Sequence, residues 1–131
     1  MYEKLIALVL ALICVLGLVG CSNGSIKGID KATEIEVVQY DISSGAEIGT
    51  VVLTEEADIN HIVDNINSLR LKKMENTDPT VLEYKLVFCN ANNEVIETVS
   101  IPANDWLGFD GYFHSITSGE LDRAYIAGLF D

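Results

Sequence analysis

Apolar and polar residues follow three different patterns along this chain. Residues 5–20 are an unbroken uncharged apolar run, whereas residues 33–131 carry short patterns with a period of two and one longer pattern with a period near 3.6. A period of two is typical of a half-buried strand, and a period of 3.6 is typical of a helix that packs by one face. The apolar run is therefore expected to stand apart from a domain of strands and helices.

Six segments of the domain are predicted to be strands. They are residues 33–41, 47–53, 80–89, 95–101, 105–109 and 112–115. The clearest is 80–89, where an apolar residue takes every second position from Leu82 to Phe88. The turn residues Ile42–Ala46, Asn90–Asn93 and Asp110-Gly111 lie between successive strands, and such turns join antiparallel neighbours. These pairs predict an antiparallel sheet built from hairpins.

One amphipathic helix is predicted after the second strand, with Thr54 as its N-cap. Its apolar stripe consists of Ile59, Ile62, Val63, Ile66 and Leu69. The basic residues that follow are expected to offset the negative end of the helix dipole, or to contact lipid headgroups; they are Arg70, Lys72 and Lys73.

A short C-terminal helix is predicted to begin at Ser118 as its cap. Its expected apolar stripe is Leu121, Ala124, Tyr125, Gly128 and Leu129. Strands grouped into pairs, with one main helix to cover a face of the sheet, indicate the α+β class.

The N-terminal run ends in a short motif with a cysteine. Lys4 precedes the run, and Leu18-Val19-Gly20-Cys21 closes it. The apolar run of residues 5–20 is short for a membrane-spanning helix, which needs about 20 residues, and no basic cluster follows it. Residues 1–21 resemble a bacterial lipoprotein signal peptide with its lipobox. The resemblance implies cleavage before Cys21, a diacylglyceryl group on that thiol, and a lipid-anchored protein on the extracytoplasmic face of the cell membrane.

The chain is thus divided into three parts. Residues 1–20 are expected to be the signal peptide, 21–32 a lipidated flexible tether rich in Gly, Ser and Asn, and 33–131 a single α+β domain. The last part resembles, in general shape only, the small domains of many Gram-positive surface lipoproteins of unknown function.

Charge and cysteine content narrow the possible partners. The net charge is −12, and removal of residues 1–20 takes away only Glu3 and Lys4, so the charge is unchanged. Such a surface disfavours nucleic acid and favours cationic partners. Cys14 would leave with the signal peptide and Cys21 would carry lipid, so Cys89 has no disulfide partner within the chain and is expected to be a small apolar residue of a strand.

Motifs for catalysis or cofactor binding are missing from the sequence. Neither of the glycine-rich phosphate motifs, nor H-E-x-x-H, nor G-x-S-x-G occurs, and the only histidines are His61 and His114. The turn at Asn90–Glu94 offers oxygen atoms but lacks the glycine and terminal glutamate of a calcium loop. We therefore expect no cofactor, no metal and no enzymatic activity.

Four aromatic residues gather around one tight turn. Trp106, Phe109, Tyr112 and Phe113 surround Asp110-Gly111. Trp106 and Tyr112 are the expected ligand-binding residues, because such side chains often anchor binding surfaces; packing of these rings against the last helix is the competing interpretation. The function expected is a non-enzymatic binding or inhibitor module. An accessory subunit of a membrane complex and a hydrolase acting on an envelope substrate are the alternatives.

Overall fold

The computed structural model describes residues 26–75 and 81–131. The predicted signal peptide and Cys21 lie outside these residues. The described elements are the 3₁₀ helix η1 (Ile29–Lys31), the strands β1 (Glu34–Tyr40), β2 (Glu47–Leu53), β3 (Arg70–Lys73), β4 (Leu82–Cys89), β5 (Val95–Pro102), β6 (Trp106–Phe109) and β7 (Tyr112–Ser118), and the helices α2 (Glu56–Ser68) and α3 (Arg123–Gly128). None of the described helices has the length and apolarity that a membrane crossing requires.

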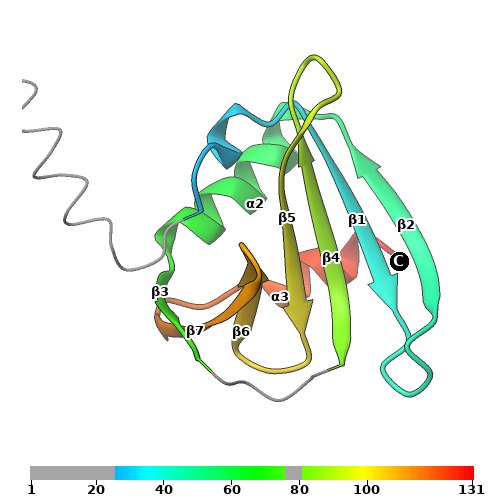
Figure 1. Cartoon of the computed structure of the whole chain (residues 1–131). Helices are drawn as coiled ribbons and strands as arrows, with labels where there is room; N and C mark the ends of the chain where they lie inside the picture. Colours follow the sequence, from blue (N-terminus) through cyan, green and yellow to red (C-terminus); the bar gives the residue numbers. More distant parts are fainter. Residues whose placement is uncertain (1–25, 76–80) are drawn as a thin grey trace, which may run out of the picture.

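The seven strands form one sheet in the order β2-β1-β4-β5-β6-β7-β3, and every pair of neighbours is antiparallel. Figure 1 shows α2 and α3 on the same side of this sheet. An antiparallel sheet with one main helix and a short C-terminal helix confirms the α+β class that the sequence predicts.

The core lies between the sheet and α2. The register aligns Val37 of β1, Leu86 of β4 and Val99 of β5 on one face of the sheet, and all three side chains are buried. The predicted stripe of α2, from Ile59 to Leu69, is buried against that face. Period two in the strands and period 3.6 in the helix thus bring two apolar surfaces together.

Strand β3 was not predicted. Arg70, Lys72 and Lys73 belong to this strand, which pairs with β7, and α2 has no basic residue in its last turn. The prediction that these residues offset the helix dipole is therefore wrong. Leu71, the one apolar residue of the strand, is buried opposite Ile116. A four-residue strand with one apolar position has no recognisable period, so its partner strand decides its conformation.

Both predicted helix caps are also wrong. Residue Glu55, not Thr54, occupies the N-cap of α2, and no side chain there accepts a hydrogen bond. Ser118 ends β7, and the cap of α3 is Asp122, whose Oδ1 accepts a hydrogen bond from the Tyr125 backbone N–H at 3.2 Å. The buried residue of α3 is Ile126, which the predicted stripe did not include, while Ala124 of that stripe is exposed.

The folded domain begins earlier than residue 33. Ile26 and Ile29 are buried members of the core, and η1 packs against α2. Gly28 turns the chain with φ of 82°, and a Cβ at this position would lie 3.2 Å from Cγ2 of Ile96. Residues 26–32 are therefore part of the domain and not of a tether. A chain that starts at residue 22 retains every element and core residue that the structure describes.

Candidate functional site

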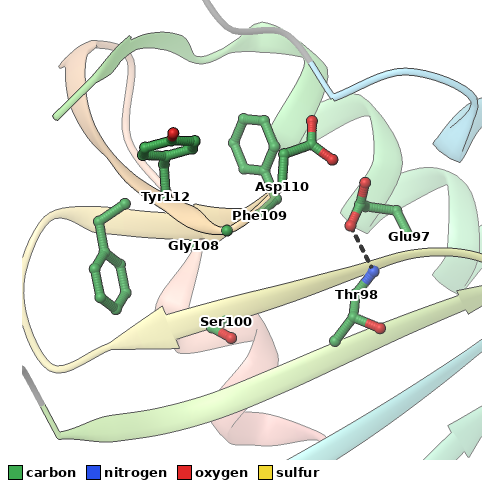
Figure 2. A pocket seen from close by; sticks show the side chains of 9 residues that line it. Glu97, Thr98, Ser100, Gly108, Phe109, Asp110 and Tyr112 are labelled. Atoms are coloured by element: carbon green, nitrogen blue, oxygen red, sulfur yellow. Dashed lines mark hydrogen bonds between the residues drawn. The ribbon is translucent and has the colours of Figure 1, made fainter. Parts of the chain in front are cut away.

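A hollow opens where β5 and β6 separate. These strands are in register at one pair, Ser100 with Gly108, so the strands are not paired on the side toward the Asp110-Gly111 turn. The space has a volume of about 410 Å³ and is named here the β5–β6 hollow. Figure 2 shows it between the β5 backbone and the β6–β7 turn. Its lining residues are Glu97, Thr98, Ser100, Gly108, Phe109, Asp110, Gly111, Tyr112 and Phe113.

Backbone geometry explains the shape of the hollow. Asp110 and Gly111 have φ of 54° and 79°, and two successive left-handed residues are the mark of a type I′ turn. This turn brings Tyr112 back beside the hollow. At Gly108, a Cβ would lie 3.0 Å from the ring of Phe113 and 3.2 Å from Cβ of Ser100. Only glycine at this position leaves the Phe113 ring its place across β6.

Tyr112 is the most exposed aromatic side chain of this site, at 48% of its surface. The Nζ atom of Lys73 lies 3.7 Å from the centroid of the Tyr112 ring. At this distance the ammonium group is attracted to the face of the ring. The Lys73 ammonium group therefore covers one face of the ring and favours this orientation of the Tyr112 side chain.

Two carboxylates border the hollow. Figure 2 shows the side chains of Glu97 and Asp110 pointing toward one another. Burial is the main cause that raises the pKa of Glu97, and the neighbouring Asp110 raises it further. The backbone N–H of Thr98 donates a hydrogen bond to Oε1 of Glu97 at 2.9 Å, which lowers the pKa and opposes part of that rise. The hollow is therefore an acidic surface next to aromatic rings.

Sequence reasoning did not identify Glu97 or Lys73 as site residues. For Glu97 a signal was present, because it occupies the same inward parity of β5 as the buried Val99 and Ile101. A charged residue in an otherwise apolar alternation indicates a polar environment inside the fold. For Lys73 no signal was present, because its contact with Tyr112 depends on the pairing of β3 with β7.

The structure does not bring the two predicted ligand-binding residues together. Pairing of Trp106 with Ser115, and of Phe109 with Tyr112, places Trp106 and Tyr112 at positions of opposite parity on the β6–β7 pair. Trp106 is partly buried, lies with its ring centroid 5.8 Å from that of Phe113, and does not line the hollow. Tyr112 lines the hollow and Trp106 lies outside it.

Behind the hollow, His114 packs as part of the core. Its ring stacks on Phe109 with centroids 3.8 Å apart, and only 4% of the residue is exposed. Burial lowers the pKa of His114, and Nδ1 has no hydrogen-bond partner among the described residues. This histidine supports Phe109 as a neutral ring and does not reach the lining of the hollow.

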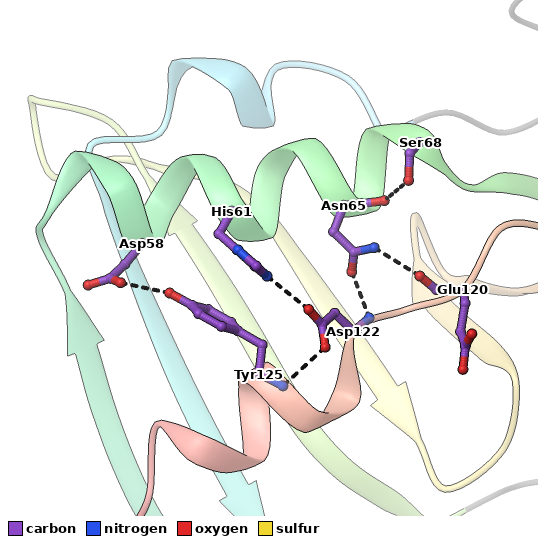
Figure 3. Close-up of polar contacts among 7 residues, drawn as sticks. All are labelled: Asp58, His61, Asn65, Ser68, Glu120, Asp122 and Tyr125. Atoms are coloured by element: carbon purple, nitrogen blue, oxygen red, sulfur yellow. Dashed lines mark hydrogen bonds and ion pairs between the residues drawn. The ribbon is translucent and has the colours of Figure 1, made fainter.

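A second polar group joins α2 to α3. Figure 3 shows this α2–α3 cluster, which consists of Asp58, His61, Asn65, Glu120, Asp122 and Tyr125. The Tyr125 hydroxyl donates to Oδ1 of Asp58 at 2.7 Å, and Nε2 of His61 lies 2.9 Å from Oδ2 of Asp122. The rings of His61 and Tyr125 stack at 3.8 Å. Oδ1 of Asn65 accepts a hydrogen bond from the backbone N–H of Asp122, and Nδ2 of Asn65 donates one to the backbone carbonyl of Glu120.

A histidine beside an aspartate raises the question of nucleophilic catalysis. Such a dyad needs the second ring nitrogen to face a serine, threonine or cysteine. The hydrogen bonds of the described residues include none between His61 and such a side chain. Burial and the hydrogen bond to Asp58 raise the pKa of Tyr125 to about 12, which disfavours a tyrosinate nucleophile. The α2–α3 cluster thus joins α2 to α3 through hydrogen bonds and a stacked pair of rings.

The remaining residues that could bind a metal stabilise the fold instead, or stand alone. Oδ1 of Asn90 accepts hydrogen bonds from the backbone N–H groups of Asn92 and Glu94, and Asn93 has φ of 60°, so this turn is held by its own asparagine. Within residues 26–75 and 81–131, no three His, Cys, Asp or Glu side chains are grouped as metal ligands. Cys89 is a partly buried free thiol whose pKa is raised by burial.

Comparisons of the chain with protein-family models, with curated proteins and with solved structures gave no match.

Proposed function

We propose that the chain is a lipoprotein tethered to the extracytoplasmic face of the cell membrane through Cys21, and that it acts there as a non-enzymatic binding module. The observation that carries the binding role is the β5–β6 hollow, whose lining includes the exposed ring of Tyr112 and the carboxylates of Glu97 and Asp110. A concave surface with aromatic walls and a few convergent polar groups is the usual form of a ligand site.

Charge defines the class of ligand that suits this site. The net charge of −12 and the two carboxylates at the hollow favour a positively charged group. An alkylammonium or guanidinium group would lie near the carboxylates while its apolar stem contacts the aromatic rings. The ligand proposed is therefore a lysine or arginine side chain presented by another protein of the cell envelope.

Binding to the hollow can be tested by titrating the chain of residues 22–131 with a short lysine-rich peptide, followed by NMR. We expect the resonances that move to belong to residues of the hollow. Tyr112→Ala should weaken binding by about tenfold or more, because removal of an anchor side chain typically costs about 2 kcal/mol. Asp110→Asn should also weaken binding while the turn persists, because asparagine tolerates the left-handed φ of 54° at this position.

Two variants at the start of β6 serve as controls, one at Asp105 just before the strand and one at Trp106, its first residue. Asp105→Asn removes an equal charge at an exposed position that does not line the hollow, so peptide binding should be unchanged. Trp106→Ala removes the aromatic ring at a position of opposite parity to Tyr112, so it should weaken peptide binding less than Tyr112→Ala does. Equal weakening by Asp105→Asn and Asp110→Asn, or by Trp106→Ala and Tyr112→Ala, would show that the hollow is not the recognition site.

Attachment to the membrane has its own test. Cys21→Ala removes the thiol that would accept the lipid, so the full-length variant should take up no radiolabelled fatty acid in cells and should retain residues 1–20. Cys14→Ala changes the neighbouring cysteine of the apolar run and should leave labelling intact. Labelled Cys21→Ala protein would contradict the lipoprotein assignment without affecting the binding role of the hollow.

A further inference from the structure

Strand β2 is a free edge of the sheet. It pairs with β1 on one side, and Figure 1 shows no described element beyond it on the other. A free edge presents unpaired backbone N–H and C=O groups, which are able to pair with another strand. The register with β1 shifts at Ile48, so residues 49–53 offer a regular side for strand addition.

The two edges of the sheet differ in how well they resist such pairing. At the opposite edge, β3 exposes Arg70, Lys72 and Lys73, and basic side chains on an edge oppose the addition of another strand. Strand β2 has no basic residue and no proline, and its one charged residue is Glu47 at its start. Of the two described edges, β2 is therefore the one without basic side chains to oppose a partner strand.

Apolar side chains accompany this open edge. Ile48 is 59% exposed and Val52 is 51% exposed, which makes them two of the most exposed large apolar residues described. Ile48 also lacks a partner on β1, because the register shifts between Gln39 and Tyr40. Both residues lie two positions from Thr50, one on each side of it. Exposed apolar surface next to unpaired backbone groups favours a partner that covers both.

The sequence of β2 is complementary to itself. In an antiparallel pair of two copies with the two-fold axis at Thr50, Ile48 of one copy lies opposite Val52 of the other, and this contact occurs twice. The one charge of the strand, Glu47, lies at its start, far from the axis, so no two like charges lie opposite each other. A second copy therefore covers the exposed Ile48 and Val52 side chains of both chains at once.

We infer that β2 is a self-association surface, through which two copies of this chain join their sheets edge to edge about Thr50. The association must overcome repulsion between two chains that each carry a net charge of −12. Because salt screens this repulsion, dimerisation strengthens as ionic strength rises.

Sedimentation equilibrium of the chain of residues 22–131, from micromolar to millimolar concentration, tests this surface. The wild-type chain should show a monomer–dimer equilibrium. Thr50→Lys places two ammonium groups opposite each other on the axis and should weaken dimerisation by at least about tenfold. Thr33→Lys adds the same charge at an exposed position outside β2 and should leave the equilibrium unchanged. Monomers at every concentration, equal weakening by the two variants, or dimers that salt dissociates would each overturn the inference.

A crosslink tests the register independently of any added charge. Directly opposed residues of an antiparallel pair have Cα atoms about 4.5–5.5 Å apart, within the range that a disulfide spans. In a Cys89→Ser background, Thr50→Cys should therefore oxidise to a covalent dimer, whereas Thr33→Cys should remain monomeric under the same conditions. Equal oxidation of the two variants, or none at Thr50→Cys, would exclude the proposed axis.

Discussion

The carboxylate of Glu97 reduces the stability of the fold at neutral pH. Its pKa is raised mainly by burial and then by Asp110, so keeping it charged in the folded state costs free energy. Glu97→Gln removes the charge, and the new amide oxygen can still accept the hydrogen bond from the Thr98 backbone N–H. We expect Glu97→Gln to melt at a higher temperature than the wild type at neutral pH, with a gain below about 1 kcal/mol.

The pH dependence of that gain has a definite sign. An acid whose pKa is raised in the folded state contributes stability that is fully present below its unfolded value, here 4.5, and that is lost as pH rises through the folded value. The advantage of Glu97→Gln should therefore shrink as pH falls toward 4.5 and vanish below it. Thermal melts across this range provide the measurement. If the stability gained by Glu97→Gln grows as the pH falls, the cost of the buried charge does not come from Glu97.

The buried ring of His114 gives the opposite pH dependence. Burial lowers its pKa from the ordinary 6.5, so its contribution to stability is present above 6.5 and is lost as pH falls through the folded value. His114→Phe keeps a flat ring against Phe109 but cannot be protonated. Melts at about pH 8 and about pH 5 should show a smaller loss in acid for His114→Phe than for the wild type.

His61→Phe is the matched control for the His114 experiment, because it removes the other histidine, whose side chain is 43% exposed in the α2–α3 cluster. The acid-dependent loss that belongs to His114 should persist in this variant. If the loss of stability in acid persists in His114→Phe and disappears in His61→Phe, the pH dependence belongs to His61 and not to His114.

At the scale of elements, the apolar face of α2 holds the helix to the sheet. Ile62→Asp places a carboxylate in that buried face, where an unpaired charge costs several kcal/mol, so the domain should lose its cooperative thermal transition or melt far below the wild type. Asn60→Asp introduces the same side chain at an exposed position of the same helix and should change the melt little. Similar melts for both variants would mean that the helix face is misassigned.

The strength of a local pattern decided which elements the sequence could predict. The stripe of α2 repeats over several turns, and the alternation in β4 covers a whole strand, so these patterns dominate their surroundings. Strand β3 and the cap of α3 have no such pattern. Leu71 is held by β7, and Asp122 is held by His61 and Asn65 of α2, so distant residues select both conformations.

At the scale of the whole molecule, the segment before β1 completes the core. Ile29 is 0% exposed, so Ile29→Ala should lower the free energy of unfolding by about 2–5 kcal/mol, as removal of a buried branched side chain does elsewhere. Ile42→Ala makes the same change at an exposed position and should have little effect. Urea unfolding measures both. An unchanged midpoint for Ile29→Ala would show that residues 26–32 belong to the tether and not to the folded domain.

The candidate site was predictable only in part for the same reason. The cluster of aromatic residues and the Asp110-Gly111 turn lie close together in the sequence, so their proximity could be predicted. The hollow arises because β5 and β6 separate after a single pair, and its acidic edge joins Glu97 of one strand to Asp110 of the turn. These relations belong to the packing of separate segments, and no short pattern of residues encodes them.

The pairing of β3 with β7 also determines when the chain is able to fold. Val37 of β1 pairs with Leu86 of β4, and Lys72 of β3 pairs with Ser115 of β7. Strands β1 and β3 therefore cannot form these pairs until β4 and β7, which are synthesised much later, are available. Pairings between strands so far apart in the sequence form slowly, because the long loop between them must close first. A nascent chain of this topology therefore cannot complete its sheet until its last strand, β7, has emerged.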